Sequence, residues 1–153
     1  MTLPILCDTR EQKPWKFKPF DVYLDTVTLS TGDYSVPWLC DYDEERDTYD
    51  PNYAVERKDG SDLVSSLTWG IDRFQDELKR ASGWESPLHV VIEEPRSPSR
   101  YQDRHFTQYH DVDREQVYKT IETLEEKHNV SFSFAGNRDN AQRKVYNLLK
   151  ARL

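Results

Sequence analysis

Residues 53–58 have the sequence Tyr-Ala-Val-Glu-Arg-Lys, and this stretch decides which fold we predict. Tyr and Val favour β-structure, and turn-forming residues stand on both sides, so the stretch is predicted to be a strand. Because side chains alternate between the two faces of a strand, Glu56 and Lys58 share one face while Arg57 points to the other. A carboxylate and an ammonium group side by side on one rigid element can hold a metal ion next to a water molecule.

The stretches around this strand alternate between strand-like and helix-like patterns. Apolar and β-branched runs predict strands over residues 3–8, 21–29, 34–40, 88–93 and 130–134. Apolar residues at helical spacing predict helices that end at Leu67, cover 71–82, begin near Asp113 and cover 139–153. We expect loops over the acidic segment 41–52 and over 94–111, and an antiparallel meander with one long connection in the first third. This order predicts an α/β fold, a mixed sheet with helices packed on its faces.

The composition fits one polar but foldable domain. The chain has 153 residues, of which 36% are hydrophobic and 32% charged, and it has no apolar run of about eighteen residues that would cross a membrane. Its two cysteines lack the spacing of a metal site, so we expect a reducing, cytoplasmic location. The net charge of −7 argues against a general nucleic-acid coat protein, but not against a nuclease, because residues 41–50 alone carry −5.

The carboxylates near residues 53–58 are spaced as a metal-dependent phosphodiesterase needs them. Hydrolysis of a phosphodiester requires an activated water, a neutralised transition-state charge and help for the leaving alkoxide, and Mg²⁺ held by one or two carboxylates supplies most of this. We predict that Asp33 and Glu56 bind the metal and that Lys58 polarises the attacking water. Asp62, one turn into the next helix, is a candidate to bind a second metal ion or to hold Lys58.

The end of the first predicted strand supplies further candidates. Asp8 and Glu11 are predicted to join the metal site or to support it, with Asp8 as a third metal ligand. Arg10 and Arg57 are interpreted as phosphate-binding or structural arginines. The alternative for the Glu-Arg-Lys stretch is a solvated surface ion pair worth under about 1 kcal/mol. The upstream Gly-Asp pair and the downstream aspartate favour the metal site over that alternative.

Together these residues resemble a known signature. Gly32-Asp33, Glu56-Arg57-Lys58 and Asp62 are similar to the GDX(n)ERKX(3)D motif of the XPF-type structure-specific endonucleases, and residues 5–11 resemble that family's strand ending in Asp-X-Arg-Glu. The resemblance covers nearly the whole chain and implies a restriction-endonuclease-like fold of the PD-(D/E)XK superfamily. It further implies Mg²⁺ or Mn²⁺ as the cofactor and branched, flap or fork DNA as the substrate, in DNA repair or recombination.

The resemblance also implies domains and partners. XPF-type proteins usually carry tandem helix-hairpin-helix motifs after the nuclease domain and often a helicase-like region before it, and this sequence has neither. We therefore expect residues 1–153 to be a nuclease domain alone, which can need a separate DNA-binding partner. In the family, the C-terminal helix-strand-helix contributes to dimer formation, so the resemblance implies a homodimer. A domain of this kind suits a nucleoid-associated protein, or a phage protein in the host cytoplasm.

Basic residues in three places are candidates for DNA contacts. Lys13 and Lys16 flank Trp15 after the first strand and can hold a single strand with the help of stacking, the alternative being a solvated loop with Trp15 in the core. Arg73 lies on the helix after the Glu-Arg-Lys strand. Arg100 lies in the long loop, which is interpreted either as a DNA-contacting flap or as disordered.

Two rival functions stay open beside the structure-specific endonuclease. One is a less selective DNA-processing nuclease of the same fold, which cleavage of linear duplex DNA would distinguish. The other is a non-catalytic DNA-binding or scaffolding subunit. Such subunits of the family typically lose the acidic and lysine residues, whereas Asp33, Glu56, Lys58 and Asp62 are all present here.

Overall fold

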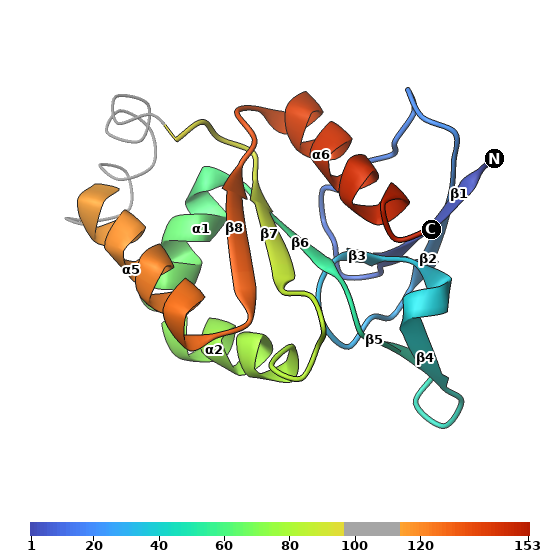
Figure 1. Cartoon of the computed structure of the whole chain (residues 1–153), viewed down its shortest axis with the longest axis horizontal. Coiled ribbons are helices and arrows are strands. Elements are labelled where there is room, and N and C mark those ends of the chain that lie inside the picture. Colours follow the sequence, from blue (N-terminus) through green and yellow to red (C-terminus); the bar gives the residue numbers. More distant parts are fainter. Residues whose placement is uncertain (97–113) are drawn as a thin grey trace.

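One mixed sheet lies at the centre of the computed structural model, which describes residues 1–96 and 114–153 (Figure 1). Its strands lie in the order β2 (Val22–Val27), β1 (Leu3–Asp8), β3 (Tyr34–Ser35), β6 (Val55–Lys58), β7 (Leu88–Ile92) and β8 (Val130–Phe134). A 3-10 helix, η1 (Pro37–Leu39), leads into a separate hairpin of β4 (Cys40–Asp43) and β5 (Thr48–Pro51). The helices of the described residues are α1 (Gly60–Leu67), α2 (Ile71–Arg80), α5 (Arg114–Lys127) and α6 (Arg138–Lys150).

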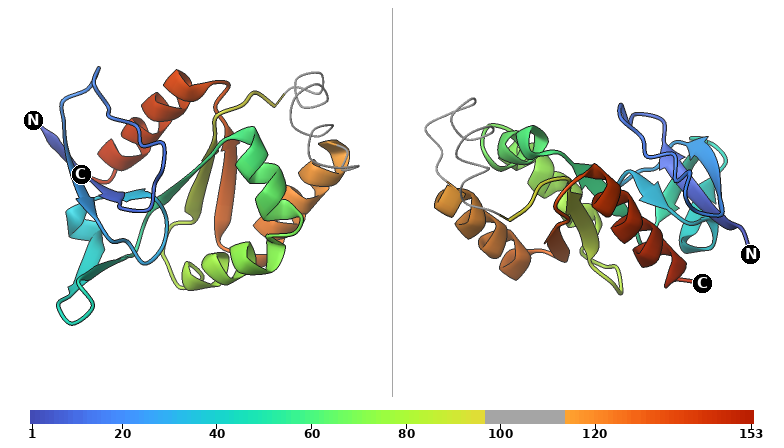
Figure 2. Two further views of the ribbon diagram at one scale, coloured as in Figure 1. Left: turned by 180° about the vertical axis from the view of Figure 1, so that it is seen from behind. Right: turned by 90° about the horizontal axis from the view of Figure 1, so that it is seen from above.

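Helices cover both faces of the sheet, as the two further views in Figure 2 also show. α1, α2 and α5 pack on one face, and Leu78 and Ile121 are buried there with side chains of β7 and β8. α6 packs on the opposite face, where Val145 and Leu149 are buried with side chains of β1, β3 and β6. The predicted mixed α/β fold with helices on the faces of the sheet is therefore confirmed.

The first two strands pair differently from the prediction. β1 and β2 are parallel along their whole length, so the predicted antiparallel meander is wrong. Parallel neighbours need a crossover connection, and residues 9–21 supply it. This connection belongs to the core, because Trp15 is only 2% exposed and stacks on Tyr34 while Phe17 packs edge-on against the same ring. Burial of these aromatic side chains holds the connection across the sheet.

The acidic segment is also ordered differently. The prediction of a loop over 41–52 is wrong, because β4 and β5 pair there as an antiparallel hairpin. The rings of Tyr42 and Tyr49 lie 4.9 Å apart across the hairpin, and Arg46 forms ion pairs with an aspartate of each strand. Such cross-strand contacts offset the repulsion between acidic residues that suggested a loop. The strand predicted over 34–40 is interrupted by η1.

Most of the later elements agree with the sequence. The helices predicted over 71–82 and 139–153 are present as α2 and α6. Asp59 caps α1, since its side chain accepts the backbone N–H of Asp62 at 2.8 Å. The loop predicted over 94–111 lies almost wholly outside the described residues. In the part of the chain that the structure describes, no helix is both long and apolar enough to span a membrane.

Candidate active site

A tight turn positions Asp33 where β1, β3 and β6 meet. Gly32 has a φ of +80°, and a Cβ at this position would lie 2.6 Å from the Cβ of Ala54, so the turn requires glycine. The backbone N–H of Asp33 donates to the carbonyl of Val55 (2.9 Å), and its own carbonyl accepts an N–H from β1 (2.8 Å). Its carboxylate accepts the backbone N–H of Arg57 at 2.7 Å. Asp33 is therefore fixed against β6 through both its backbone and its side chain.

Asp33, Glu56 and Glu77 bring three carboxyl groups together between the sheet and α2. Burial, together with the charge of Glu11, raises the pKa of Asp33 to about 7, although hydrogen bonds to its carboxylate oppose the shift. Burial and the charges of Asp33 and Glu77 raise the pKa of Glu56 well above its usual range, while Lys58 opposes that shift. A hydrogen bond also joins the side chains of Glu56 and Glu77. Because the buried carboxylates repel one another, a divalent cation among them would be stabilised.

Lys58 lies on the same face of β6 as Glu56, as strand alternation predicts. Its side chain is 8% exposed, and its Nζ lies 5.0 Å from the centre of the Phe74 ring on α2. A cation over an aromatic face is attracted to the ring electrons, so Phe74 helps to fix the ammonium group. Arg57, between the two, contacts residues on the other face.

Two adjoining cavities open beside these side chains. Asp33, Glu56 and Glu77 line the first, which has a volume of about 370 Å³, and Lys58 lines the second, of about 360 Å³. Arg73 and Glu77 line both, so α2 forms the wall that the cavities share. The cationic residues that line the first cavity are Arg10, Arg73 and Arg80. The first cavity thus combines carboxylates for a metal ion with guanidinium groups for phosphate oxygens.

Asp8 lines the first cavity, but its oxygens already have partners. Its Oδ2 accepts the Nε–H of Arg10 at 2.8 Å, and its Oδ1 accepts the backbone N–H of Leu29 at 2.9 Å. Arg10 in turn donates to the carbonyl of Leu29 at 2.6 Å. Asp8 and Arg10 therefore tie the end of β1 to the segment that follows β2.

Arg57 and Glu11 belong to a buried ion-pair network on the α6 side of the sheet. Arg57 is 7% exposed and contacts Glu11 at 3.1 Å and Glu93 at 2.7 Å. Glu93 also pairs with Arg138 at the start of α6 (3.0 Å). Of the two interpretations of Arg57, phosphate-binding or structural, this geometry is that of a structural arginine.

The remaining predicted residues lie around the cavities. Asp62 is in the first turn of α1; burial and the charge of Asp59 raise its pKa, and Lys58 is close enough to oppose that shift. Lys13 and Lys16 are exposed in the connection over residues 9–21. Arg73 lines both cavities, and Arg100 lies outside the described residues.

Glu77 and Arg80 line the first cavity, although no sequence motif pointed to them. The Nε–H of Arg80 donates to the Oγ1 of Thr31 at 3.0 Å, which holds the guanidinium group at the cavity wall. A signal exists in the helical spacing, since Arg73, Asp76, Glu77 and Arg80 recur at i, i+3, i+4 and i+7 and form one charged stripe along α2. The sequence does not show which part of the fold this charged face of α2 lies against, so the stripe identifies the cavity wall only once the structure is known.

The first cavity fits a hard divalent cation. Mg²⁺ binds proteins through one or two carboxylates and keeps several waters, and Mn²⁺ prefers similar oxygen ligands. Asp33 and Glu56 supply two carboxylates. Within residues 1–96 and 114–153, no group of three or more His, Cys, Asp or Glu side chains is arranged to hold a metal ion, so Asp8 does not complete a three-residue ligand set with them.

Comparisons with known proteins identify relatives of this fold. The profile of the ERCC4 domain family matches residues 7–148. None of the curated proteins matches the chain. Among solved structures, XPF from Aeropyrum pernix is similar at 20% identity with a TM-score of 0.68, over 97% of this chain and 61% of that chain. XPF from Aeropyrum pernix in complex with DNA is similar at 18% identity with a TM-score of 0.67, over 98% of this chain and 64% of that chain. These structural matches confirm the predicted fold, and the chain spans less than two thirds of either XPF chain.

Proposed function

The chain belongs to the ERCC4 domain family, and on that premise we propose that it is a metal-dependent DNA endonuclease. In this proposal it hydrolyses phosphodiester bonds at branched, flap or fork DNA. The observation that carries the proposal is the placement of Asp33 and Glu56 at one cavity, with Lys58 on the same face of β6. XPF from Aeropyrum pernix, whose fold the chain shares, has been solved in complex with DNA, which supports DNA as the substrate.

Asp33 and Glu56 would hold Mg²⁺ or Mn²⁺. Such an ion, when bound, makes a water more acidic and neutralises negative charge on a phosphoryl oxygen. The raised pKa values of both carboxyl groups fit this role, because the repulsion between them disappears when a cation lies among them. Glu77 lines the same cavity beside them and adds to its negative charge.

Lys58 and two arginines would act on the substrate. Lys58 is held beside the aromatic ring of Phe74, from where its ammonium group donates hydrogen bonds to the attacking water and to developing negative charge. Arg73 and Arg80 line the first cavity, with Asp33 and Glu56, and would hold the phosphate oxygens. A low-dielectric, preorganised site makes these charges more effective than they are in water.

The test is cleavage of labelled 3′-flap, fork and linear duplex DNA with Mg²⁺ or Mn²⁺. Wild type should cut in a metal-dependent way, and Asp33→Ala and Lys58→Ala should each abolish cutting. The matched control variants are Asp25→Ala on β2 and Lys119→Ala on α5, which remove the same charges at exposed positions and should retain activity. Folded wild type that cuts none of these substrates with either metal would refute the proposal.

The substrate ranking in the same assay separates the rival functions. Preference for flaps and forks supports structure-specific cleavage, for which the proposed physiological setting is DNA repair or recombination. Equal cleavage of linear duplex DNA supports a less selective DNA-processing nuclease. Binding without cleavage supports a scaffolding subunit.

We also propose that residues 1–153 form one nuclease domain that assembles as a homodimer through α5, β8 and α6. β8 forms an edge of the sheet, where a strand can pair with another chain, although the N–H of Phe132 already donates to Glu125 of α5 (3.1 Å). Light scattering after size-exclusion chromatography tests this, since a monomer at all concentrations would contradict it. A separate DNA-binding partner is a further proposal, which weak DNA binding by the purified chain would support.

A further inference from the structure

The cavity beside Lys58 differs in chemistry from the one beside Asp33. Its described lining includes the aromatic rings of Trp69 and Phe74, the hydroxyl-bearing Ser65, and the cations Lys58 and Arg73. Its volume of about 360 Å³ is in the range of small-ligand sites, which run from roughly 300 to 1,000 Å³. The combination of an aromatic face with nearby cations suits a group that is flat at one end and anionic at the other.

Trp69 is presented to solvent by a rigid turn between α1 and α2. Its side chain is 62% exposed. The turn is closed by two hydrogen bonds, from the Oγ1 of Thr68 to the carbonyl of Val64 (2.7 Å) and from the N–H of Gly70 to the carbonyl of Ser65 (3.0 Å). A Cβ on Gly70 would lie 2.9 Å from that same carbonyl oxygen. The backbone at Gly70 therefore approaches the end of α1 too closely for a larger residue. These contacts fix the backbone that carries the indole before a ligand arrives, which lowers the entropic cost of binding.

The two cavities lie next to each other along one path. Arg73 and Glu77 line both cavities, and Glu56 and Lys58, two residues apart on one face of β6, each line one of them. A DNA strand with its phosphate beside Glu56 therefore has its neighbouring nucleotide beside Lys58 and Trp69. The base of that nucleotide can reach an aromatic face only if it is not paired and stacked in a duplex.

Building on the proposed nuclease function, we infer that this second cavity binds one unpaired nucleotide of the DNA, adjacent to the bond that is cut. The base stacks on Trp69, and its phosphate faces Arg73. Base–aromatic stacking tolerates any base, so the site recognises single-stranded character rather than sequence. This makes Trp69 a determinant of selectivity for single-strand/duplex junctions.

The test is a base-deletion scan of junction DNA. Fluorescein-labelled flap DNA carries a single abasic site that is moved one nucleotide at a time through the unpaired strand. Affinity is measured by fluorescence anisotropy without divalent metal, so that the DNA stays intact. For wild type, one abasic position next to the junction should weaken binding about tenfold, which is the size expected for one stacked base. In Trp69→Ala the same abasic site should have little further effect, whereas Trp69→Phe should keep most of the difference.

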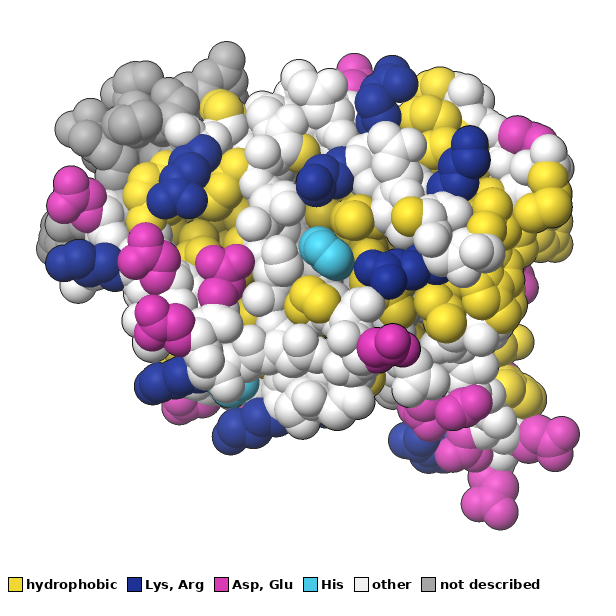
Figure 3. Space-filling view, viewed as in Figure 1, with side chains coloured by type: hydrophobic (Ala, Val, Ile, Leu, Met, Phe, Trp, Pro, Cys, Tyr) yellow, Lys and Arg dark blue, Asp and Glu magenta, His cyan; other side chains and the backbone are white. Residues whose placement is uncertain are grey.

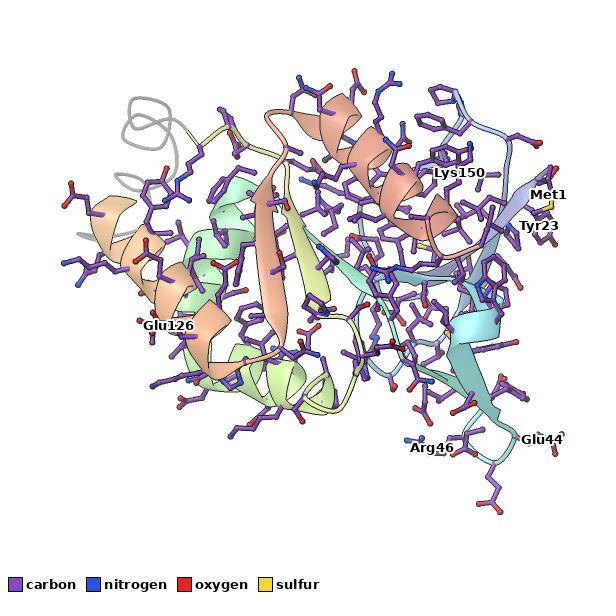
Figure 4. The ribbon with its side chains drawn as sticks, viewed as in Figure 1. Met1, Tyr23, Glu44, Arg46, Glu126 and Lys150 are labelled. Atoms are coloured by element: carbon purple, nitrogen blue, oxygen red, sulfur yellow. The ribbon has the colours of Figure 1, made fainter. Side chains whose placement is uncertain are left out.

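Tyr23→Ala is the matched control, because Tyr23 is 64% exposed and lies at the end of the molecule that carries the N-terminus (Figure 4). It should bind every DNA as wild type does. Thermal melting of each variant separates loss of stacking from loss of folding. Because Trp69→Phe keeps an aromatic ring, its retained binding tests stacking even if Trp69→Ala folds poorly.

The outcomes separate this inference from the nuclease proposal. The inference is overturned if no position of the abasic site weakens binding by wild type, or if the same position weakens binding equally in Trp69→Ala. Either result overturns it even if the wild type cuts DNA. Failure of wild type to bind junction DNA also overturns it. A sensitive position that depends on Trp69 supports the inference even if wild type proves unable to cut.

Discussion

Glu77 adds a carboxylate to the cavity beside Asp33 and Glu56, and its charge acts on Glu56. Replacing it in Glu77→Gln removes one of the like charges that raise the pKa of Glu56. The metal-free protein should then gain about 1 kcal/mol in its free energy of unfolding at neutral pH, since one pKa unit corresponds to roughly 1.4 kcal/mol. Mn²⁺ should bind several-fold more weakly, because less negative charge attracts it. Urea unfolding in EDTA and calorimetric titration with Mn²⁺ measure the two effects.

The control for this change is Asp76→Asn, on the same helix. Asp76 lines the same cavity, but its charge is not among those that shift Asp33 or Glu56. It should alter stability and Mn²⁺ affinity less than Glu77→Gln does. Equal effects of the two substitutions would show that only the overall charge of α2 matters.

Asp33 should make the metal-free protein less stable as the pH rises. Its pKa is raised from the usual 3.8 to about 7, first by burial and then by the charge of Glu11, so folding favours the protonated carboxyl group. The stability that this group contributes is present below pH 3.8 and is lost as the pH rises towards about 7. In EDTA the melting temperature of wild type should therefore fall across this range, and added Mg²⁺ should restore it near pH 7.

The effect of Asp33 is isolated by the difference in melting temperature between wild type and Asp33→Asn, measured at each pH in EDTA. His89 has a lowered pKa caused mainly by burial, so it contributes stability of the opposite sign, which rises with pH. His89 is present in both proteins and cancels in the difference between them. If the melting temperatures of the two proteins changed with pH in the same way, the role of Asp33 would be contradicted.

At the scale of elements, Arg57 joins three segments that are distant in the sequence. It connects β6 to Glu11 after β1 and to Glu93 after β7, and Glu93 reaches α6 through Arg138. Arg57→Met would leave the buried carboxylate of Glu11 without its cation and would leave Glu93 with Arg138 alone. The free energy of unfolding should fall by about 3 kcal/mol or more, because breaking a buried ion pair costs roughly 3–5 kcal/mol. Urea denaturation measures this loss.

Arg46→Met is the matched control in the β4–β5 hairpin. Arg46 also pairs with two acids, Asp43 and Asp50, but its side chain is exposed. Removing an exposed pair should leave the free energy of unfolding almost unchanged, because solvent screens its charges. If Arg57→Met were equally mild, the buried network would contribute little to holding β1, β6 and α6 together.

The elements also show which parts of the fold a sequence can reveal. Local patterns predicted α2, α6 and β8, because their periodicity and turn residues act within one segment. The parallel pairing of β1 with β2 was missed, since it depends on the burial of Trp15 and Phe17 in a connection that resembles a solvated loop. The β4–β5 hairpin was missed for a similar reason, because its acids are balanced by Arg46 across the strands.

In the candidate site, too, some features follow from local sequence and others depend on contacts between distant segments. The alternation of one strand predicted the shared face of Glu56 and Lys58, and the fold places Asp33 at the same cavity as Glu56. Arg10 contacts Asp8 from two residues away, but Leu29 could not be predicted as its partner, because Leu29 reaches Asp8 only through the pairing of β1 and β2. The roles predicted for these residues stay predictions until the cleavage assay is done.

At the scale of the whole molecule, charge is unevenly distributed. Residues 12–20, which lie within the connection over 9–21, include three lysines and no acid. α6 has four cations and one acid. Together the two segments carry +6 in a chain of net −7, so the rest carries −13. Of these −13 charges, the β4–β5 hairpin carries −5. Figure 3 shows Asp and Glu side chains gathered on the projecting hairpin, and Lys and Arg side chains over α6. DNA approaching this molecule is therefore repelled by one part of its surface and attracted by another.

The acidic hairpin should influence DNA only through long-range repulsion. Glu44 lies at its tip, away from the body of the molecule, beside the equally exposed Glu45 (Figure 4). Glu44→Gln combined with Glu45→Gln lowers the net negative charge by two. Association with flap DNA should become about twofold faster at low ionic strength. The gain should vanish near physiological salt, where the screening length is about 8 Å. Stopped-flow anisotropy measures the association and dissociation rates, and the dissociation rate should not change.

The comparison that interprets this result is Glu122→Gln combined with Glu126→Gln on α5. These residues are exposed, and Glu126 lies at the opposite end of the molecule (Figure 4), so the charge changes equally at a different place. If repulsion acts through net charge, both variants should speed association to a similar extent and lose the gain in salt together. A gain confined to the hairpin variant that survives at high salt would mean that the hairpin touches the DNA. The hairpin would then be part of the substrate-binding surface, and its acids would select against DNA that comes too close.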